Sequence, residues 1–269
     1  MYFNRSHILS CLLVGVMVIV SSLVVTAVGA AETPRDLIEA VRTDDLNRVE
    51  RLIMLGVDVN SARGDGSTAL HWAVHREHID ISDLLIDSGA DINAADDHGV
   101  TPLALACLNG SSVMVERLLR AGADATSVRS TGETVLMTAA RVGNVDVVRQ
   151  LLTAGADPTS SESSRGQTAL MWAVAENHTA VARLILETAG GATSRSANGF
   201  SPLLFAAQQG NVDIARMLLA AGADVNESAP DGIGGDTNTQ DIFREGTDAS
   251  ALMVAIDSGH SEMARFLIE

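Results

Sequence analysis

Three histidines lie close together in the segment HWAVHREH, residues 71–78. His71, His75 and His78 are spaced at i, i+4 and i+7, so one continuous helix would align their imidazoles on one face. Imidazole nitrogens bind zinc, and a catalytic zinc site needs three protein ligands and one open position. The spacing therefore permits a metal-dependent activity, provided that a single helix holds all three residues.

The composition excludes several other kinds of chemistry. All 18 basic residues are arginine, which excludes a phosphate-loop lysine and Schiff-base catalysis. The 34 acidic residues give a net charge of -16, and the arginines form no run, so we expect no nucleic-acid binding. The chain has no nucleophile-elbow pattern, no recognisable pair of catalytic carboxylates and no CxxC motif. We therefore expect no catalytic residue and no cofactor.

Two similar stretches, TALHWAV at 68–74 and TALMWAV at 168–174, contain the only two tryptophans. Each follows a glycine by two residues, and glycines at this position recur with spacings of 33, 33, 34 and 33: Gly66, Gly99, Gly132, Gly166 and Gly199. Such a period indicates a repeat architecture. The two stretches are then the same helix start in units one and four.

Each unit is predicted to contain two short helices. Thr or Ser at the position of Thr68 caps the first helix, and Pro102 and Pro202 fit its first turn. A second helix follows, as in VDVVRQLLTAG, and ends at a glycine that favours left-handed backbone: Gly89, Gly122, Gly155 and Gly222. In unit four this position is Ala189, so we expect a distorted connection there.

The second helices are followed by SGAD at 88–91 and AGAD at 121–124, 154–157 and 221–224. With these motifs, the chain resembles the ankyrin repeat family over about residues 32–269. The resemblance implies an all-α solenoid of stacked helix-turn-helix units with short β-hairpin-like connecting loops. The expected organisation is a capping repeat at 32–62, five repeats at 63–95, 96–128, 129–162, 163–195 and 196–228, an inserted loop at 229–247, and a final incomplete repeat at 248–269. SEMARFLIE at the end reads as an interior helix, so we expect the natural chain to continue.

The repeat pattern gives structural interpretations for the residues that suggested chemistry. His71 occupies the histidine of the family's TPLH motif, and His78 is matched by His178 and His260. A turn at Glu77 is expected to interrupt the helix, so we favour structural histidines over a metal site. Packing is likewise favoured over an exposed anchoring role for Trp72 and Trp172. Cys107 is expected to be a small core residue rather than a nucleophile.

The inserted segment contains Asp231, Asp236, Asn238 and Asp241. These side chains suggest calcium, but their spacing matches no EF-hand or glycine-rich calcium repeat. The GIGG at 232–235 has no preceding strand that would make it a phosphate cradle. We therefore favour a flexible loop.

The N-terminal segment has the pattern of an export signal. Residues 8–28 are almost wholly apolar, follow Arg5, and lead to Ala30 and Ala31, where cleavage is expected. The same segment is long enough to span a bilayer as an uncleaved anchor. We expect an exported bacterial protein, periplasmic or extracellular, that touches the membrane only if this segment stays in place.

The predicted function is binding of another protein without catalysis. The alternative is a non-catalytic repeat portion of a larger enzyme or sensor that continues beyond Glu269. In ankyrin-repeat proteins the concave surface consists of hairpin tips and the ends of first helices. The resemblance assigns these positions to His75, Arg76, Val100, Leu108, Asn109, Glu133, Arg141, Val142, Gln167, Glu176, Phe200, Gln208 and Gln209.

These positions differ between units while the framework residues recur. We therefore expect Phe200→Ala combined with Arg141→Ala to weaken partner binding by about 2 kcal/mol or more, because aromatic and arginine side chains dominate interfaces. The melting transition is expected to stay nearly unchanged.

Overall fold

The computed structural model describes residues 33–229 and 249–269. These ranges contain 14 helices and one two-stranded antiparallel pair. The first helices of the successive units are α2 (Pro34–Arg42), α4 (Ala69–His75), α6 (Pro102–Asn109), α8 (Val135–Val142), α10 (Ala169–Ala175), α12 (Pro202–Gln209) and α14 (Ala251–Asp257). The second helices are α3 (Leu46–Met54), α5 (Ile79–Asp87), α7 (Ser112–Arg120), α9 (Val145–Thr153), α11 (Thr179–Ala189), α13 (Val212–Ala220) and α15 (Ser261–Ile268).

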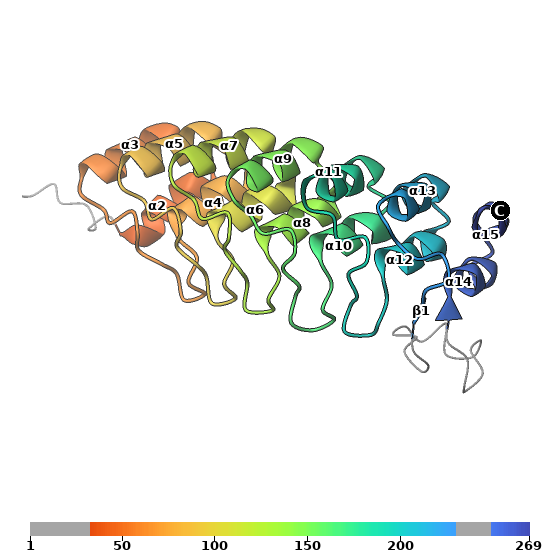
Figure 1. Ribbon diagram of the computed structural model, residues 1–269. Helices are drawn as coiled ribbons and strands as arrows, with labels where there is room; N and C mark the ends of the chain where they lie inside the picture. The colour runs from red at the N-terminus through yellow and green to blue at the C-terminus, as the bar shows by residue number, and fades with distance from the viewer. Residues whose placement is uncertain (1–32, 230–248) are drawn as a thin grey trace, which may run out of the picture.

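The helices stack as pairs along one axis. Figure 1 shows the second helices in one row and the first helices in another, with the connecting loops projecting from the first-helix side. Each pair packs on its neighbours because a pair of short helices cannot bury its apolar faces alone. The all-α solenoid predicted from the sequence is confirmed. The exact unit boundaries remain predictions.

The residues predicted to cap the first helices stand directly before those helices. Thr101, Thr134, Thr168 and Ser201 each accept a hydrogen bond from the backbone N–H three residues later. The four glycines predicted to end second helices have positive φ, from 86° at Gly89 to 99° at Gly122. The expected irregularity in unit four is also present, since α11 has 11 residues and ends at Gly190.

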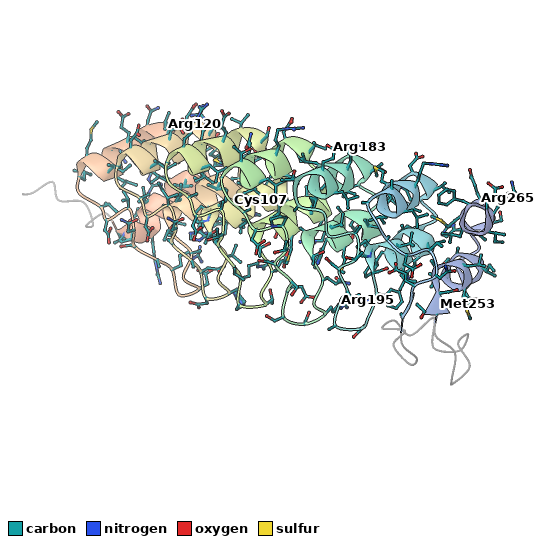
Figure 2. All side chains as sticks on the ribbon, in the orientation of Figure 1. Cys107, Arg120, Arg183, Arg195, Met253 and Arg265 are labelled. Carbon is teal, nitrogen blue, oxygen red and sulfur yellow. The ribbon has the colours of Figure 1, made fainter. Side chains whose placement is uncertain are left out.

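The core runs without interruption along the solenoid. On α4, the side chains of Leu70, Ala73 and Val74 are fully buried, and the alanine allows the neighbouring first helix to approach closely. Cys107 is also fully buried, and Figure 2 places it in the middle of the helical stack. The prediction of a core cysteine is confirmed.

Hydrogen bonds also link successive loops, which project from the first-helix side of the stack. The backbone N–H of Asp97 donates to the Asp65 carbonyl at 3.1 Å, and the same bond recurs one unit later from Ser130 to His98 at 3.2 Å. The Asn60 side chain spans two units, because its amide donates to the Gly89 carbonyl at 3.0 Å. These bonds fix the spacing of the loops, which carry part of the predicted binding face.

Two strands close the base of the inserted segment. In β1 (Ser228–Ala229) and β2 (Ala249–Ser250), Ser228 pairs with Ser250 and Ala229 with Ala249. The predicted export segment and the interior of the insertion lie outside the described residues. Within the described ranges, no helix has the length and apolar character needed to cross a membrane.

Candidate functional site

The three clustered histidines do not share one helix. Helix α4 ends at His75, Glu77 has a φ of 60°, and His78 caps the start of α5. The His71 Nδ1 lies 3.2 Å from the Thr68 backbone N–H, which can only donate to it. The His71 Nε2 must then carry the proton that it donates to the Val100 carbonyl, 3.0 Å away. Both nitrogens of His71 therefore hold structural hydrogen bonds, as the repeat pattern indicated.

The histidines that follow the inter-helix turn connect neighbouring units. The Nε2 of His178 lies 2.9 Å from the Arg141 carbonyl, and the Nε2 of His260 lies 3.0 Å from the Gln208 carbonyl. The Nδ1 of His78 instead lies 3.0 Å from Asp44 Oδ1 in the capping unit. Among the described residues, no group of three or more His, Cys, Asp or Glu side chains is arranged to hold a metal ion.

We define the first-helix face as the surface formed by the loops and by the C-terminal ends of the first helices. The sequence-predicted positions all lie on these elements, but their exposure differs. Exposed positions are His75, Arg76, Leu108, Glu176 and Gln208. Half-buried positions are Val100, Asn109, Arg141, Val142, Gln167, Phe200 and Gln209. Glu133 is buried.

Several of these residues already make hydrogen bonds or packing contacts within the repeats. The Asn109 amide donates to the carbonyls of Val74 and His75 at 3.1 and 3.2 Å, which links α6 to α4. Glu133 is only 9% exposed, and its carboxylate accepts from Thr138 Oγ1 at 2.9 Å. Phe200 packs against Phe205 with ring centroids 5.6 Å apart. A variable position in this repeat is therefore not always free for a partner.

Both tryptophans lie half-buried on the first-helix face, and each stacks with arginine. The Arg42 guanidinium lies 5.2 Å from the Trp72 ring centroid, and Arg63 lies 5.5 Å from the same centroid. Arg141 lies 5.3 Å from the Trp172 ring. The preference for packing over free exposure agrees with the burial, although neither ring is fully enclosed. These stacks place planar guanidinium groups on the surface beside accessible aromatic rings.

The sequence prediction missed Arg42, Arg63 and Arg129 on this face. Arg129 Nη1 lies 3.1 Å from Glu133 Oε2, and Arg141 Nη2 lies 3.6 Å from Glu133 Oε1. A sequence signal did exist: Arg63 and Arg129 both stand three residues before the repeat glycine. The sequence prediction used only the position after that glycine and the two positions after the AA-like dipeptide, so it did not include Arg63 or Arg129.

The carboxylates of Glu162 and Asp65 accept hydrogen bonds within their own loops. Burial raises the pKa of Glu162, but hydrogen bonds from Ser164, Gln167 and Arg165 together outweigh burial and lower the pKa. The Ser67 hydroxyl and backbone N–H lower the pKa of Asp65 in the same way. Burial alone raises the pKa of the Cys107 thiol to about 12. None of these groups combines access to solvent with the partners that a nucleophile or general base requires.

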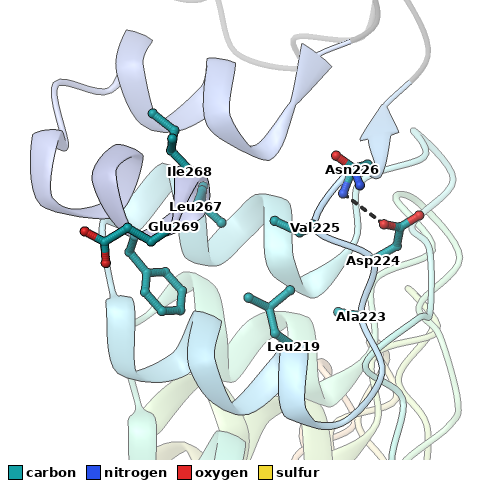
Figure 3. Close-up of a pocket in the computed structure, with 9 residues that line it drawn as sticks. Leu219, Ala223, Asp224, Val225, Asn226, Leu267, Ile268 and Glu269 are labelled. Carbon is teal, nitrogen blue, oxygen red and sulfur yellow. Dashed lines mark hydrogen bonds between the residues drawn. The ribbon is translucent and has the colours of Figure 1, made fainter.

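A second candidate surface lies at the C-terminal end. An open cavity of about 680 Å³ is lined by Leu219, Ala223, Asp224, Val225, Asn226 and residues 266–269. Figure 3 shows these side chains between the loop after α13 and the end of α15. Ile268, which lines the cavity, is 71% exposed. The lining is mostly apolar and holds no cluster of charged donors.

The comparisons with known proteins agree with this architecture. A family model for ankyrin repeats, described as three copies, matches residues 37–129, 99–162 and 136–229. The chain therefore belongs to the ankyrin repeat family, whose domains generally mediate contacts with other proteins. A search of curated proteins found none with significant similarity.

Proposed function

We propose that the chain is a non-catalytic ankyrin-repeat scaffold that binds one protein partner on its first-helix face. The observation that carries this proposal is the exposure of unlike side chains at one repeated position. His75, Leu108 and Gln208 occupy equivalent sites at the ends of three first helices, and all three are exposed. Leu108 is apolar and 47% exposed, where water alone favours a polar residue.

The test compares Leu108→Arg with Val113→Arg. Val113 lies in the first turn of the second helix α7 and is 51% exposed, so the two positions match in apolar character and exposure but lie on different helix rows. A partner captured with residues 32–269 is first identified and purified, and its affinity for each variant is then measured by calorimetry. We expect Leu108→Arg to weaken binding at least about tenfold, because it buries a charge at the interface.

Val113→Arg should bind like the parent. Equal affinity of the parent and Leu108→Arg would contradict the assignment of the face. A loss on Val113→Arg alone would move the binding surface to the second helices.

The proposal extends to localisation. Residues 8–28 are supported as an export signal by their apolar run and by the small residues that follow. We propose cleavage after Ala30 or Ala31 and a periplasmic or extracellular mature protein. N-terminal sequencing of the mature chain should start at residue 31 or 32. A start at Met1, with the chain held in the membrane, would contradict cleavage and support the anchor.

The absence of catalysis is proposed together with the absence of structural zinc. The hydrogen bonds of His71 and the break at Glu77 support this part of the proposal. Elemental analysis of the purified chain should find well under one zinc per molecule. One tightly bound zinc that disappears in His71→Ala with His75→Ala would overturn it.

A further inference from the structure

Two arginine–tryptophan sites lie on the first-helix face, three first helices apart. Site one contains Arg42, Arg63 and Trp72, with Glu39 beside Arg42. Site two contains Arg129, Arg141 and Trp172, with Glu133 between the arginines. Each site thus combines two guanidinium groups, one carboxylate and one indole ring.

At each site two guanidinium groups have one carboxylate within ion-pair distance. In site one, Arg42 pairs with Glu39 at 3.1 Å, whereas Arg63 forms no ion pair within the described ranges. Asp65 faces the Arg63 charge beyond ion-pair distance, and its carboxylate is occupied by Ser67. In site two, Arg129 and Arg141 share the single carboxylate of Glu133. One added carboxylate would balance site two, and at site one it would give Arg63 the direct ion-pair partner that it lacks among the described residues.

Site two also contains N–H groups that have no acceptor. The Nε atoms of Arg129 and Arg141 and the indole nitrogen of Trp172 are buried without a hydrogen-bond partner among the described residues. The equivalent indole nitrogen of Trp72 donates to Ser67 Oγ at 3.2 Å, but unit four has Gln167 in place of that serine. Buried donors without acceptors are costly, so site two gains stability when these side chains shift and an incoming acceptor reaches them.

We propose that the first-helix face binds an extended acidic segment of the partner, with Asp or Glu side chains seated at site one and site two. The inference rests on the proposed function and adds the chemistry of the partner. A guanidinium stacked on an indole keeps its N–H edge free, and that edge matches a carboxylate with two parallel hydrogen bonds. The side chains of Arg42 and Arg141 are 40% and 36% exposed, so each can be reached in part from solvent.

The strongly negative net charge does not oppose this proposal. Exposed charges more than about 8–10 Å away are largely screened at physiological salt, so the local arginines decide the interaction. First helices packed at about 8–10 Å spacing put α4 and α10 roughly 24–30 Å apart. An extended chain covers that distance in about eight or nine residues.

The test uses a synthetic peptide with blocked termini, in which two glutamate pairs are separated by about eight Gly and Ser residues. Blocked termini ensure that only side-chain carboxylates are tested. The chain's two tryptophans report binding by fluorescence: Trp172→Phe isolates Trp72 at site one, and Trp72→Phe isolates Trp172 at site two. We expect a saturable change in both variants. Replacing Glu with Gln in the peptide should weaken binding at least about tenfold.

Arg63→Gln should weaken peptide binding several-fold, since Arg63 forms no ion pair with any residue that the structure describes. Arg120→Gln is the matched control, because Arg120 lies on the second-helix row (Figure 2) and pairs there with Glu116. Thermal melting of each variant checks that the fold is retained. Equal binding of the Glu and Gln peptides, or equal effects of the two arginine variants, would overturn the inference.

These outcomes are separable from those for the proposed function. If Leu108→Arg abolishes binding of the captured partner while the acidic peptide does not bind, the first-helix face is correct and the acidic recognition is wrong. If the peptide binds but Leu108→Arg and Val113→Arg leave partner affinity unchanged, the proposed function fails and the two acid-binding sites stand.

Discussion

Arg141 stacks on Trp172 across the boundary between two units, with its guanidinium 5.3 Å from the ring centroid. Arg42 and Trp72 repeat this relationship at the start of the solenoid, at 5.2 Å. In both cases the arginine ends one first helix, and the tryptophan lies in the middle of the next. The stack therefore joins neighbouring units as well as shaping the surface.

A double-mutant cycle should measure this contact. Arg141→Leu and Trp172→Leu introduce the residue types of Leu108 and Leu105, which stand at the equivalent positions of unit two. We expect a coupling free energy of about 0.5–1 kcal/mol from urea unfolding, as for other partly exposed cation–π pairs. Additive effects of the two changes would show that the stack contributes nothing to stability.

The contacts of Arg141 and Phe200 predict that their double alanine variant is less stable than the parent, unlike the expectation from the sequence. Loss of Arg141 removes one of the two guanidinium groups beside the buried Glu133, and loss of Phe200 removes its packing on Phe205. We now expect that variant to lose at least about 1 kcal/mol of stability. Binding tests of the first-helix face are therefore better made with Arg63→Gln at site one, where no ion pair among the described residues is lost.

Cys107 should resist thiol reagents in the folded protein. Burial raises the pKa of its thiol to about 12, so the reactive thiolate is almost absent at pH 8, and the sulfur is inaccessible. In a Cys11→Ala background, we expect labelling by a disulfide reagent only after addition of denaturant. Complete labelling within seconds in native buffer would contradict the buried position.

Two glycines with similar backbone angles should differ in their tolerance of alanine. A Cβ at Gly143 would lie 2.4 Å from the ring of His178, whereas a Cβ at Gly122 would have no neighbour within 4 Å. Both have positive φ, so each substitution costs about 1 kcal/mol from backbone strain. Gly143→Ala should cost clearly more, because the His178 ring must leave the Arg141 carbonyl. Thermal melting of the pair checks this, and equal melting temperatures would contradict it.

Acid should destabilise the loops through Asp124 and Asp157. The hydroxyl and backbone N–H groups of Thr126 and Thr159 donate to these carboxylates and lower their pKa values. Because each pKa is lower in the folded state, the stabilisation is complete above the unfolded value of about 3.9 and is lost as pH falls through the folded value.

The variant Thr126→Val with Thr159→Val should therefore melt below the parent at pH 7, and the difference should narrow at about pH 2–3. Melting curves across this range check the sign. Glu227 has the opposite effect on the pH dependence of stability. Burial raises its pKa, so its protonation favours the folded state. A gap between variant and parent that widens in acid would contradict the assignment.

Extending the chain should stabilise its C-terminal end. Residues 221–226, Ala-Gly-Ala-Asp-Val-Asn, follow the second helix of unit five and cover its end. Appending the same six residues after Glu269 should cover Leu267 and Ile268 beside the open cavity and add about 1–2 kcal/mol. A Gly-Ser tail of equal length is the control. Equal urea midpoints for the two extensions would contradict this account of the end surface.

The fold was predictable because glycine, capping and apolar positions recur with a fixed period. Thr101 and Gly122 have local roles that their residue types reveal. The candidate site was only partly predictable. Equivalent positions carry Val100, Glu133 and Phe200, but the burial of Glu133 depends on Thr138 and two arginines from different segments. No period encodes a contact of that kind, because it occurs only once.

The short pairing of β1 with β2 brings the two ends of the inserted segment together. Ser228 and Ser250 face each other directly, so the chain leaves the solenoid and returns to it at one point. Changing the length of a connection between fixed ends alters the closure entropy only slowly, by about 0.6 kcal/mol for each doubling. The length of residues 230–248 can therefore change at a small cost in closure entropy while the stack on either side keeps its own contacts. The paired residues Ala229 and Ala249 are thus a position at which segments of different sequence can be inserted between folded repeats.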